Sequence, residues 1–344
     1  MFGRFPVHSS QRAQMEPKQH YSNLHKQVLG LLAAALLLNG CGSKPAENGD
    51  GAITGDLMIF HAGSLSIPFR EVSALFTQKY PAVTIKAEAA GTRDSARKIT
   101  DLGRRCDVLG AADYMVVENL LVPDHSDFNI RFATNEMVIA YTEKSGMHQA
   151  INSANWHELL FRPGIIFGRS DPDRDPCGYR TVTLFQLAEK HYHAPGLVAK
   201  LAGKTGSQVI RPKETDLLAL LEAGEIDYLF IYRSVAQQHK LRILDLPPEI
   251  NLGSVSHAEL YASATVQVTG KRPGQFITIK GGPIAYSVTI PTNAPNRKAA
   301  EAYVALLLSA EGRAVMARNG QKPITPAQAR PRDNLPASLT KFCR

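Results

Sequence analysis

Cysteine is scarce in this sequence, and its spacing excludes the common metal sites that cysteine builds. The four cysteines among 344 residues are Cys41, Cys106, Cys177 and Cys343, and no two of them form a CxxC pair. Zinc and iron–sulfur ligand patterns are therefore missing. Outside the cytoplasm a disulfide between Cys106 and Cys343 could form, but the sequence does not establish one.

The motifs of familiar catalytic and nucleotide-binding sites are missing as well. The sequence contains no GxSxG, HExxH, GxGxxG or P-loop pattern. Its eleven histidines are scattered without metal-ligand spacing, and His61 is more typical of a packed or surface histidine than of a catalytic base. We therefore expect no catalytic residues and no enzyme.

Charge of one sign is only mildly in excess, which excludes a typical nucleic-acid-binding protein. The chain has 39 basic and 31 acidic residues and a formal net charge of +8, and no Lys/Arg-rich run is interleaved with aromatic residues. Without residues 1–40, which hold four of the basic residues and one of the acidic ones, the net charge is 35 − 30 = +5. Such an excess favours attraction of small anions.

The apolar run at residues 27–38 is shorter than the roughly 20 residues that a membrane-spanning helix needs. Basic residues Lys18 and Lys26 precede it, and Leu38-Asn39-Gly40-Cys41 follows it like a lipoprotein processing box. We expect cleavage before Cys41, which would carry the lipid anchor. An ordinary signal peptide that happens to end near a cysteine is the alternative, and either Met1 or Met15 could start the chain.

Beyond residue 55, short apolar strands alternate with amphipathic helices, which predicts an α/β fold with sheets covered on both faces. We expect strands at 57–60, 83–85, 107–112, 136–141, 228–232 and 283–290, and helices from Pro68 and over 93–104, 156–160, 181–192, 215–223 and 298–308. Two lobes joined by two crossing strands, near 136–142 and 283–290, would follow. The predicted segments are a lipoprotein signal peptide (1–40), a flexible tether (41–54), the first part of lobe 1 (55–139), lobe 2 (140–284), a return to lobe 1 (285–330) and a surface tail (331–344).

Polar segments stand where predicted strands pass into helices, the position at which open α/β sheets bind ligands. The segment 61–66 carries Ser64, and the segment 91–95 carries Thr92 and Ser95. Backbone amides at a helix start, together with such hydroxyls, suit an anion. A tight turn and simple helix capping are the alternatives.

A third segment, 170–180, holds the alternating acids Asp171, Asp173 and Asp175. The spacing is similar to that of a calcium loop. Pro172 and Pro176 interrupt it, however, and the glycine and distal glutamate of an EF-hand do not follow. We therefore do not favour calcium.

Four segments in this order resemble one family: residues 60–66, 171–180, 224–236 and 289–297. The chain strongly resembles the archaeal-type tungstate/molybdate-binding proteins that serve ABC importers, over about residues 57–326. The resemblance implies a type II periplasmic-binding-protein fold, in which two α/β lobes close over the oxyanion.

The resemblance also implies that two carboxylates complete a six-fold coordination of the tungsten or molybdenum. By motif these carboxylates belong to Asp175 and Glu214, with Asp216 as a rival for the second. Capping of the following helices is the alternative role for Asp175 and Glu214. The other residues implied in oxyanion binding are Gly63, Ser64, Thr92, Ser95, Pro176, Cys177 and Tyr232.

These observations predict a monomeric lipoprotein in the periplasm or at the cell surface that captures tungstate or molybdate. It would deliver the ion to an ABC permease and its ATPase, without a cofactor, without a nucleic-acid partner and without chemical change. Three alternatives stay open: a sulfate or phosphate binder on the same fold, a sensory or adhesion lipoprotein, and an enzyme on this scaffold. The sequence ranks neither tungstate over molybdate nor one membrane over another.

Cys177→Ser separates the binder from the enzyme. Porphobilinogen deaminase-like enzymes share the two-lobed architecture but need a cofactor-bearing cysteine. A binder should keep most of its affinity in calorimetry, because serine conserves the shape of the side chain. A turnover reaction that the wild type performs and the variant loses would contradict the binder.

Overall fold

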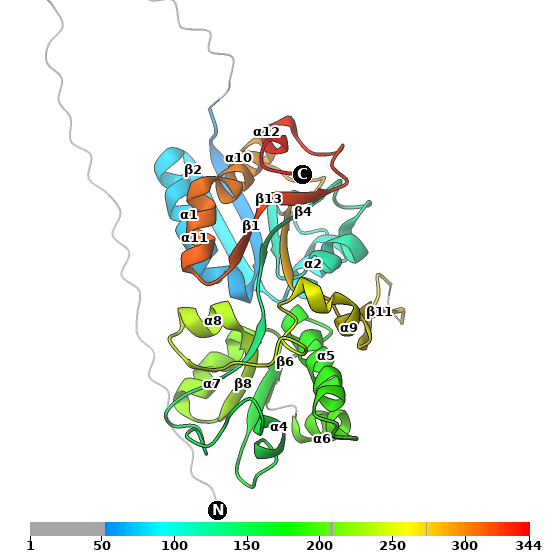
Figure 1. Ribbon diagram of the computed structural model, residues 1–344. Coiled ribbons are helices and arrows are strands. Elements are labelled where there is room, and N and C mark those ends of the chain that lie inside the picture. Colours follow the sequence, from blue (N-terminus) through cyan, green and yellow to red (C-terminus); the bar gives the residue numbers. More distant parts are fainter. Residues whose placement is uncertain (1–51, 207–208, 273) are drawn as a thin grey trace, which may run out of the picture. The chain divides into compact units, whose positions relative to one another are not determined.

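Two sheets organise the part of the chain that the computed structural model describes, residues 52–206, 209–272 and 274–344 (Figure 1). The predicted signal peptide, the anchor at Cys41 and most of the predicted tether lie outside these residues. Within them, no helix combines the length and the apolar character that crossing a membrane requires.

The sheet of lobe 1 has the strand order β13-β4-β12-β3-β1-β2. Strands β2, β1 and β3 run parallel, whereas β12 is antiparallel to β3 and β4, and β13 is antiparallel to β4. The bounds are β1 Gly55–Ala62, β2 Val83–Ala90, β3 Val108–Ala111, β4 Asn129–Thr134, β12 Ala285–Thr289 and β13 Lys322–Arg330.

Side chains of β1 alternate between two hydrophobic cores, which is why both faces of this sheet are covered. Leu57 and Ile59 belong to one core, and Phe60 belongs to the other. On the first face, Phe69 and Phe76 of one helix pack edge-on against Tyr303 of another. The helical segments of this lobe are η1 Gly63–Leu65, α1 Ser66–Lys79, α2 Thr92–Thr100, α3 Tyr114–Val116, η2 Val117–Leu121, α10 Arg297–Leu308, α11 Ala310–Arg318 and α12 Ala337–Thr340.

The sheet of lobe 2 has the order β7-β6-β8-β5-β9, and its strands are β5 Met137–Tyr141, β6 Phe167–Ser170, β7 Ile210–Arg211, β8 Tyr228–Tyr232 and β9 Arg242–Leu244. Trp156 and Phe230 pack edge-on in its core. Its helices are α4 Trp156–Leu159, α5 Pro176–His191, α6 Leu197–Lys204, η4 Glu214–Leu217, α7 Leu218–Ala223 and α8 Arg233–Gln238.

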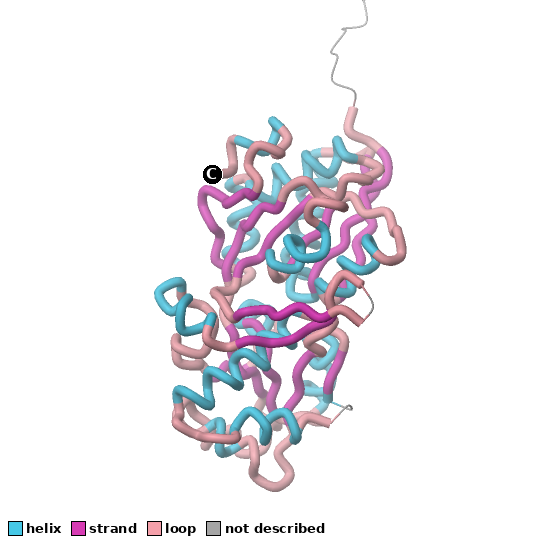
Figure 2. Tube along the Cα trace, turned by 90° about the vertical axis from the view of Figure 1, so that its right-hand side faces the viewer, coloured by secondary structure: helices cyan, strands magenta, loops and turns pink. Residues whose placement is uncertain are grey.

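A separate antiparallel pair, β10 Thr265–Thr269 and β11 Phe276–Lys280, follows η5 Val255–His257 and α9 Ala258–Ala262. Figure 2 shows this pair as two magenta strands apart from the two larger sheets. Its apolar face packs on α5 through Val266, Val268 and Ile279, which contact Tyr179.

The chain passes between the lobes in short segments and not within the strands that we expected to cross. All partners of β5 lie in the second sheet, and all partners of β12 lie in the first. The outward passage is the pair Asn135–Glu136, and the return lies at 281–284. A strand stays within one sheet because its backbone groups find all their partners there.

Two other expectations differ from the structure. The helix expected at 181–192 begins at Pro176, because proline is well tolerated in the first turn. Residues 331–344 are mostly exposed, as a surface tail would be, but they are held to the fold: Leu339 and Cys343 are buried, and the amide of Ala327 donates to the carbonyl of Phe342 at 3.0 Å.

The possible disulfide does not form. Cys106 and Cys343 are both free and buried, and they belong to different hydrophobic clusters.

Gly110→Ala should destabilise lobe 1. A methyl group there would lie 2.7 Å from Cζ of Phe69, and overpacking of a core typically costs about 1–3 kcal/mol. Gly203→Ala is the matched control in helix α6, where a methyl group meets nothing within 4 Å and should stabilise by roughly 0.5–1 kcal/mol. Urea unfolding measures the change in stability of both variants. An unchanged midpoint for Gly110→Ala would show that the core rearranges to accept the methyl group.

Candidate functional site

The predicted site residues gather at the carboxyl ends of parallel strands in both lobes. Residues 63–64 follow β1, and residues 92–95 follow β2 in lobe 1. In lobe 2, Asp175 follows β6, Glu214 follows β7, and Tyr232 ends β8. This is the edge at which open α/β sheets hold ligands, and the helices that start there direct backbone amides toward it.

The two lobes touch at this edge. A methyl group on Gly63 would lie 3.4 Å from Oε1 of Glu214 in the other lobe, and one on Gly91 would overlap the carbonyl oxygen of Arg174. The backbones therefore approach closely, which only glycine permits at Gly91. Across the same seam, the guanidinium of Arg174 pairs with the carboxylate of Asp94 at 2.7 Å. The site is enclosed between the lobes.

Asp175 and Glu214 form a fully buried pair of carboxyl groups, each with no exposed surface. Asp175 occupies the N-cap position of α5, but its side chain does not cap the helix, and neither does Glu214 at the start of η4. None of the four carboxyl oxygens has a hydrogen-bond partner of good geometry, although the hydroxyls of Ser170 and Ser64 lie nearby. The capping alternative therefore does not explain these acids.

The electrostatics of this pair are unfavourable. Burial raises the pKa of Asp175 well above its ordinary value, and the neighbouring charge of Glu214 raises it further. Burial also raises the pKa of Glu214. Buried polar groups are nearly always hydrogen-bonded, and each exception needs an explanation. Two adjacent, ionisable carboxyl groups that are buried without hydrogen bonds indicate a ligand-binding site.

Hydroxyl groups of lobe 1 belong to the same strand ends, and Ser64 lies beside Glu214. Ser64 and Ser95 are buried, and their Oγ atoms have no hydrogen-bond partner. Oγ1 of Thr92 accepts the amide proton of Ala112 at 3.0 Å, which leaves its own proton free to donate. These groups can bind the oxygens of an anion.

Tyr232 and Cys177 lie at the lobe 2 side of the site. The Tyr232 hydroxyl accepts from Nη1 of Arg180 at 2.8 Å, and burial raises its pKa well above the ordinary value, so that it stays a donor. The Cys177 thiol donates to the carbonyl of Phe230 at 3.7 Å within the hydrophobic core. Cys177 and Pro176 can therefore contribute only the backbone of the first turn of α5.

The three acids of the calcium-like spacing point apart. Asp171 Oδ1 accepts the amide of Asp173 at 2.9 Å, and Asp173 Oδ1 accepts the amide of Thr269 at 2.8 Å. Asp175 instead faces Glu214. Among the described residues, no group of three His, Cys, Asp or Glu side chains could hold a metal ion.

Two structural facts refine the residue list. Asp216, the rival to Glu214, pairs with Lys213 and is partly exposed, whereas Glu214 is the acid beside Asp175. Ser170, which sequence reasoning missed, is buried next to Asp175 with an unpartnered hydroxyl. It is the last residue of β6, so recognising that strand would have indicated it.

Comparison with known proteins identifies relatives along most of the chain. The family model of bacterial extracellular solute-binding proteins matches residues 57–322. A solute-binding protein of Petrotoga mobilis is 49% identical over 85% of this chain and 91% of its own length. The molybdate/tungstate-binding protein WtpA of Pyrococcus abyssi is 42% identical over 87% of this chain and 93% of its own.

Among solved structures, the periplasmic molybdate-binding protein of Azotobacter vinelandii superposes with a TM-score of 0.56 at 14% identity, covering 77% of this chain and 98% of that one. This likeness concerns the fold and confirms the expected type II periplasmic-binding-protein fold.

Acidic pH should favour the closed arrangement of the ligand-free protein. A carboxyl group whose pKa is raised on closure holds its proton more tightly when closed, so closure is favoured at low pH and lost as the pH rises through the raised values of Asp175 and Glu214. Small-angle scattering from about pH 4 to 8, a range that begins near the ordinary carboxyl pKa, should show the radius of gyration rising.

Asp175→Asn should flatten this profile, because the amide carries no charge to repel Glu214. Asp216→Asn is the control and should leave the profile unchanged, since Asp216 is paired with Lys213 at the rim. A profile that Asp175→Asn does not alter would show that the pair does not govern closure.

Proposed function

The chain belongs to the family of bacterial extracellular solute-binding proteins, and we propose that the solute it captures is tungstate or molybdate. Proteins of this family bind a solute and are not enzymes. The oxyanion is therefore cargo and not a cofactor. The relative from Pyrococcus abyssi, whose name gives both anions, supports the choice.

The observation that carries the proposal is the buried, unpartnered pair Asp175 and Glu214. Two carboxylates repel a dianion that offers them only oxygen: like unit charges 4 Å apart cost about 4 kcal/mol at an effective dielectric of 20. The repulsion is overcome if the carboxylate oxygens bond to the central atom of the anion. Tungsten and molybdenum accept such extra oxygen ligands, whereas sulfur and phosphorus do not readily do so.

The same pair would give selectivity. Sulfate and phosphate would bring negative oxygens against Asp175 and Glu214 without a compensating bond, so a more abundant anion would be rejected. Around the metal centre, the hydroxyls of Ser64, Thr92 and Ser95 would donate to the oxo groups from lobe 1. From lobe 2, Tyr232 would do the same, and Gly63, Pro176 and Cys177 would line the site through their backbones.

The transport role follows from the family and the leader sequence together. In this proposal Cys41 carries a lipid that keeps the monomeric receptor at the outer face of a membrane. The lobes close over the oxyanion, and the loaded protein delivers it to an ABC permease driven by its ATPase.

Asp175→Ala and Glu214→Ala should each abolish most of the affinity for tungstate and molybdate. Losing even an outer-shell partner of a bound metal costs up to about a hundredfold in affinity, so losing a direct ligand should cost at least that much. Isothermal titration calorimetry of residues 42–344 measures the change, and circular dichroism checks the fold.

Asp216→Ala is the matched control, because it removes a nearby acid that lies at the rim and pairs with Lys213. It should bind as the wild type does. Wild-type affinity in Asp175→Ala, or a titration in which sulfate binds more tightly than tungstate, would contradict the proposal.

A further inference from the structure

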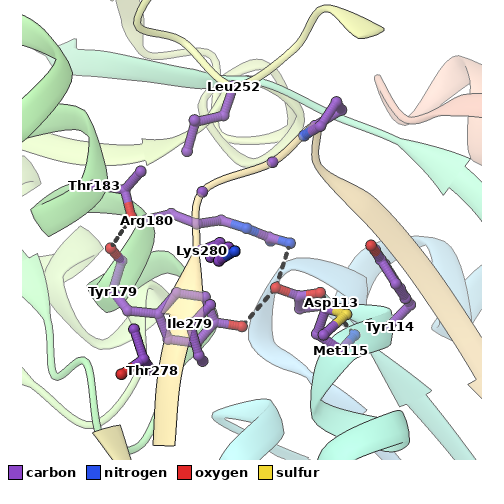
Figure 3. A pocket seen from close by; sticks show the side chains of 13 residues that line it. Asp113, Tyr114, Met115, Tyr179, Arg180, Thr183, Leu252, Thr278, Ile279 and Lys280 are labelled. Atoms are coloured by element: carbon purple, nitrogen blue, oxygen red, sulfur yellow. Dashed lines mark hydrogen bonds and ion pairs between the residues drawn. The ribbon is translucent and has the colours of Figure 1, made fainter. Parts of the chain in front are cut away.

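Arg180 of α5 is a buried guanidinium that reaches from lobe 2 into lobe 1 (Figure 3). Its Nη2 pairs with Oδ2 of Asp113 at 2.9 Å, and its Nη1 donates to the carbonyl of Ala112 at 2.8 Å. Nη1 also donates to the Tyr232 hydroxyl at 2.8 Å within lobe 2. One side chain therefore joins the end of β8 to the residues that follow β3.

Asp113 receives a second bond from the same helix. The hydroxyl of Tyr179 donates to Oδ2 of Asp113 at 2.6 Å, while Oδ1 caps α3 by accepting the amide of Met115 at 2.9 Å. Figure 3 shows Tyr179 and Arg180 converging on Asp113 beside a cavity of about 320 Å³ that residues of both lobes line. Asp113 and Arg180 are only 5% and 4% exposed, so the ion pair is almost dry in this arrangement.

Each end of this cluster leads to a residue of the proposed oxyanion site. On lobe 1, Ala112 accepts from Arg180 through its carbonyl and donates its amide proton to Oγ1 of Thr92. On lobe 2, Tyr232 accepts from Arg180. Both hydroxyls thus have an acceptor position filled, and each retains its own proton to donate.

Helix α5 connects the cluster to the carboxylate pair. Asp175 is the N-cap residue of α5, and Tyr179 and Arg180 lie little more than one turn further along it. A displacement of α5 that brings Asp175 to the ligand therefore also brings Tyr179 and Arg180 to Asp113.

We propose that Asp113, Tyr179 and Arg180 form a latch between the lobes, and that Arg180 is a positioning residue that orients Thr92 and Tyr232 as donors to the bound oxyanion. The inference rests on the proposed function and adds a determinant of how long the anion stays bound. The latch holds the closed protein through Asp113, while Arg180 presents the two hydroxyls.

The cluster can act as a latch because the buried charges of Asp113 and Arg180 are paired with each other across the lobes. Removing one partner from a buried ion pair leaves the other charge with neither water nor a counter-charge, which strongly destabilises the state in which that charge is buried. An open protein pays no such cost, because water reaches both groups. Variants that weaken the cluster should therefore act on the closed state, and the rate of ligand release should change more than the rate of capture.

Tyr179→Phe and Asp113→Asn test the latch by a small and a larger perturbation. Tyr179→Phe removes only the hydroxyl, and a lost hydrogen bond to a charged group predicts release about tenfold faster or more. Asp113→Asn, which leaves Arg180 without its counter-charge, should accelerate release further. Stopped-flow fluorescence with tungstate gives the capture and release rates separately, and the capture rate should change less than release.

Glu118→Gln is the matched control, because the pair of Glu118 with Arg131, at 3.3 Å, joins an acid and an arginine within lobe 1 alone. It should leave both rates unchanged. Thermal unfolding without ligand separates a stability defect from a latch defect.

If the wild type does not bind tungstate or molybdate, the proposed function fails and not the latch alone. If the wild type binds and Tyr179→Phe and Asp113→Asn release the anion at the wild-type rate, the latch is wrong while the function stands. Faster release in Glu118→Gln as well would show a general weakening and would equally overturn the latch.

Discussion

The structure depends on one unfavourable feature, the burial of two carboxyl groups side by side without hydrogen bonds. Burial and the neighbouring charge of Glu214 raise the pKa of Asp175, burial raises the pKa of Glu214, and the nearby hydroxyls of Ser170 and Ser64 offset these shifts only in part. Such an arrangement lowers the stability of the closed protein. It persists where a ligand supplies the missing bonds, and the rest of the fold can be understood as the means of presenting this pair.

The strand order places the pair where it can act. In both sheets the parallel strands end at the seam between the lobes, so their loops supply backbone amides and hydroxyls from two sides. Arg180 also reaches across that seam, and its charge is matched by Asp113. In the proposed function, selectivity would come from the carboxylates, which would distinguish oxyanions by their central atom and not by their charge.

Much of this could be predicted from sequence, for identifiable reasons. Alternating apolar strands and helices predicted the α/β class, and four ordered motifs identified the family. The assignment of Asp175 and Glu214 as ligands remains a prediction. Ser170 was missed because β6 is short and proline-rich sequence follows it. Tyr179 and Arg180 were placed ahead of the helix, since the helix was expected to begin five residues too late. Their partner Asp113 lies far away in the chain, and no local pattern reports such a contact.

The burial of the C-terminal residues was missed for a similar reason. Prolines made residues 331–344 resemble a surface tail, yet Leu339 and Cys343 complete a core assembled from distant segments. Burial is a property of the whole fold, and composition alone predicts it poorly at chain ends.

In the proposed function, Asp175 and Glu214 bond to the central atom of the anion. X-ray absorption spectroscopy at the tungsten or molybdenum edge tests it most directly, because it reports the oxygen neighbours of that atom. Two additional, longer metal–oxygen distances are expected in the protein complex compared with the free anion. An unchanged tetrahedral spectrum for the bound anion would contradict it.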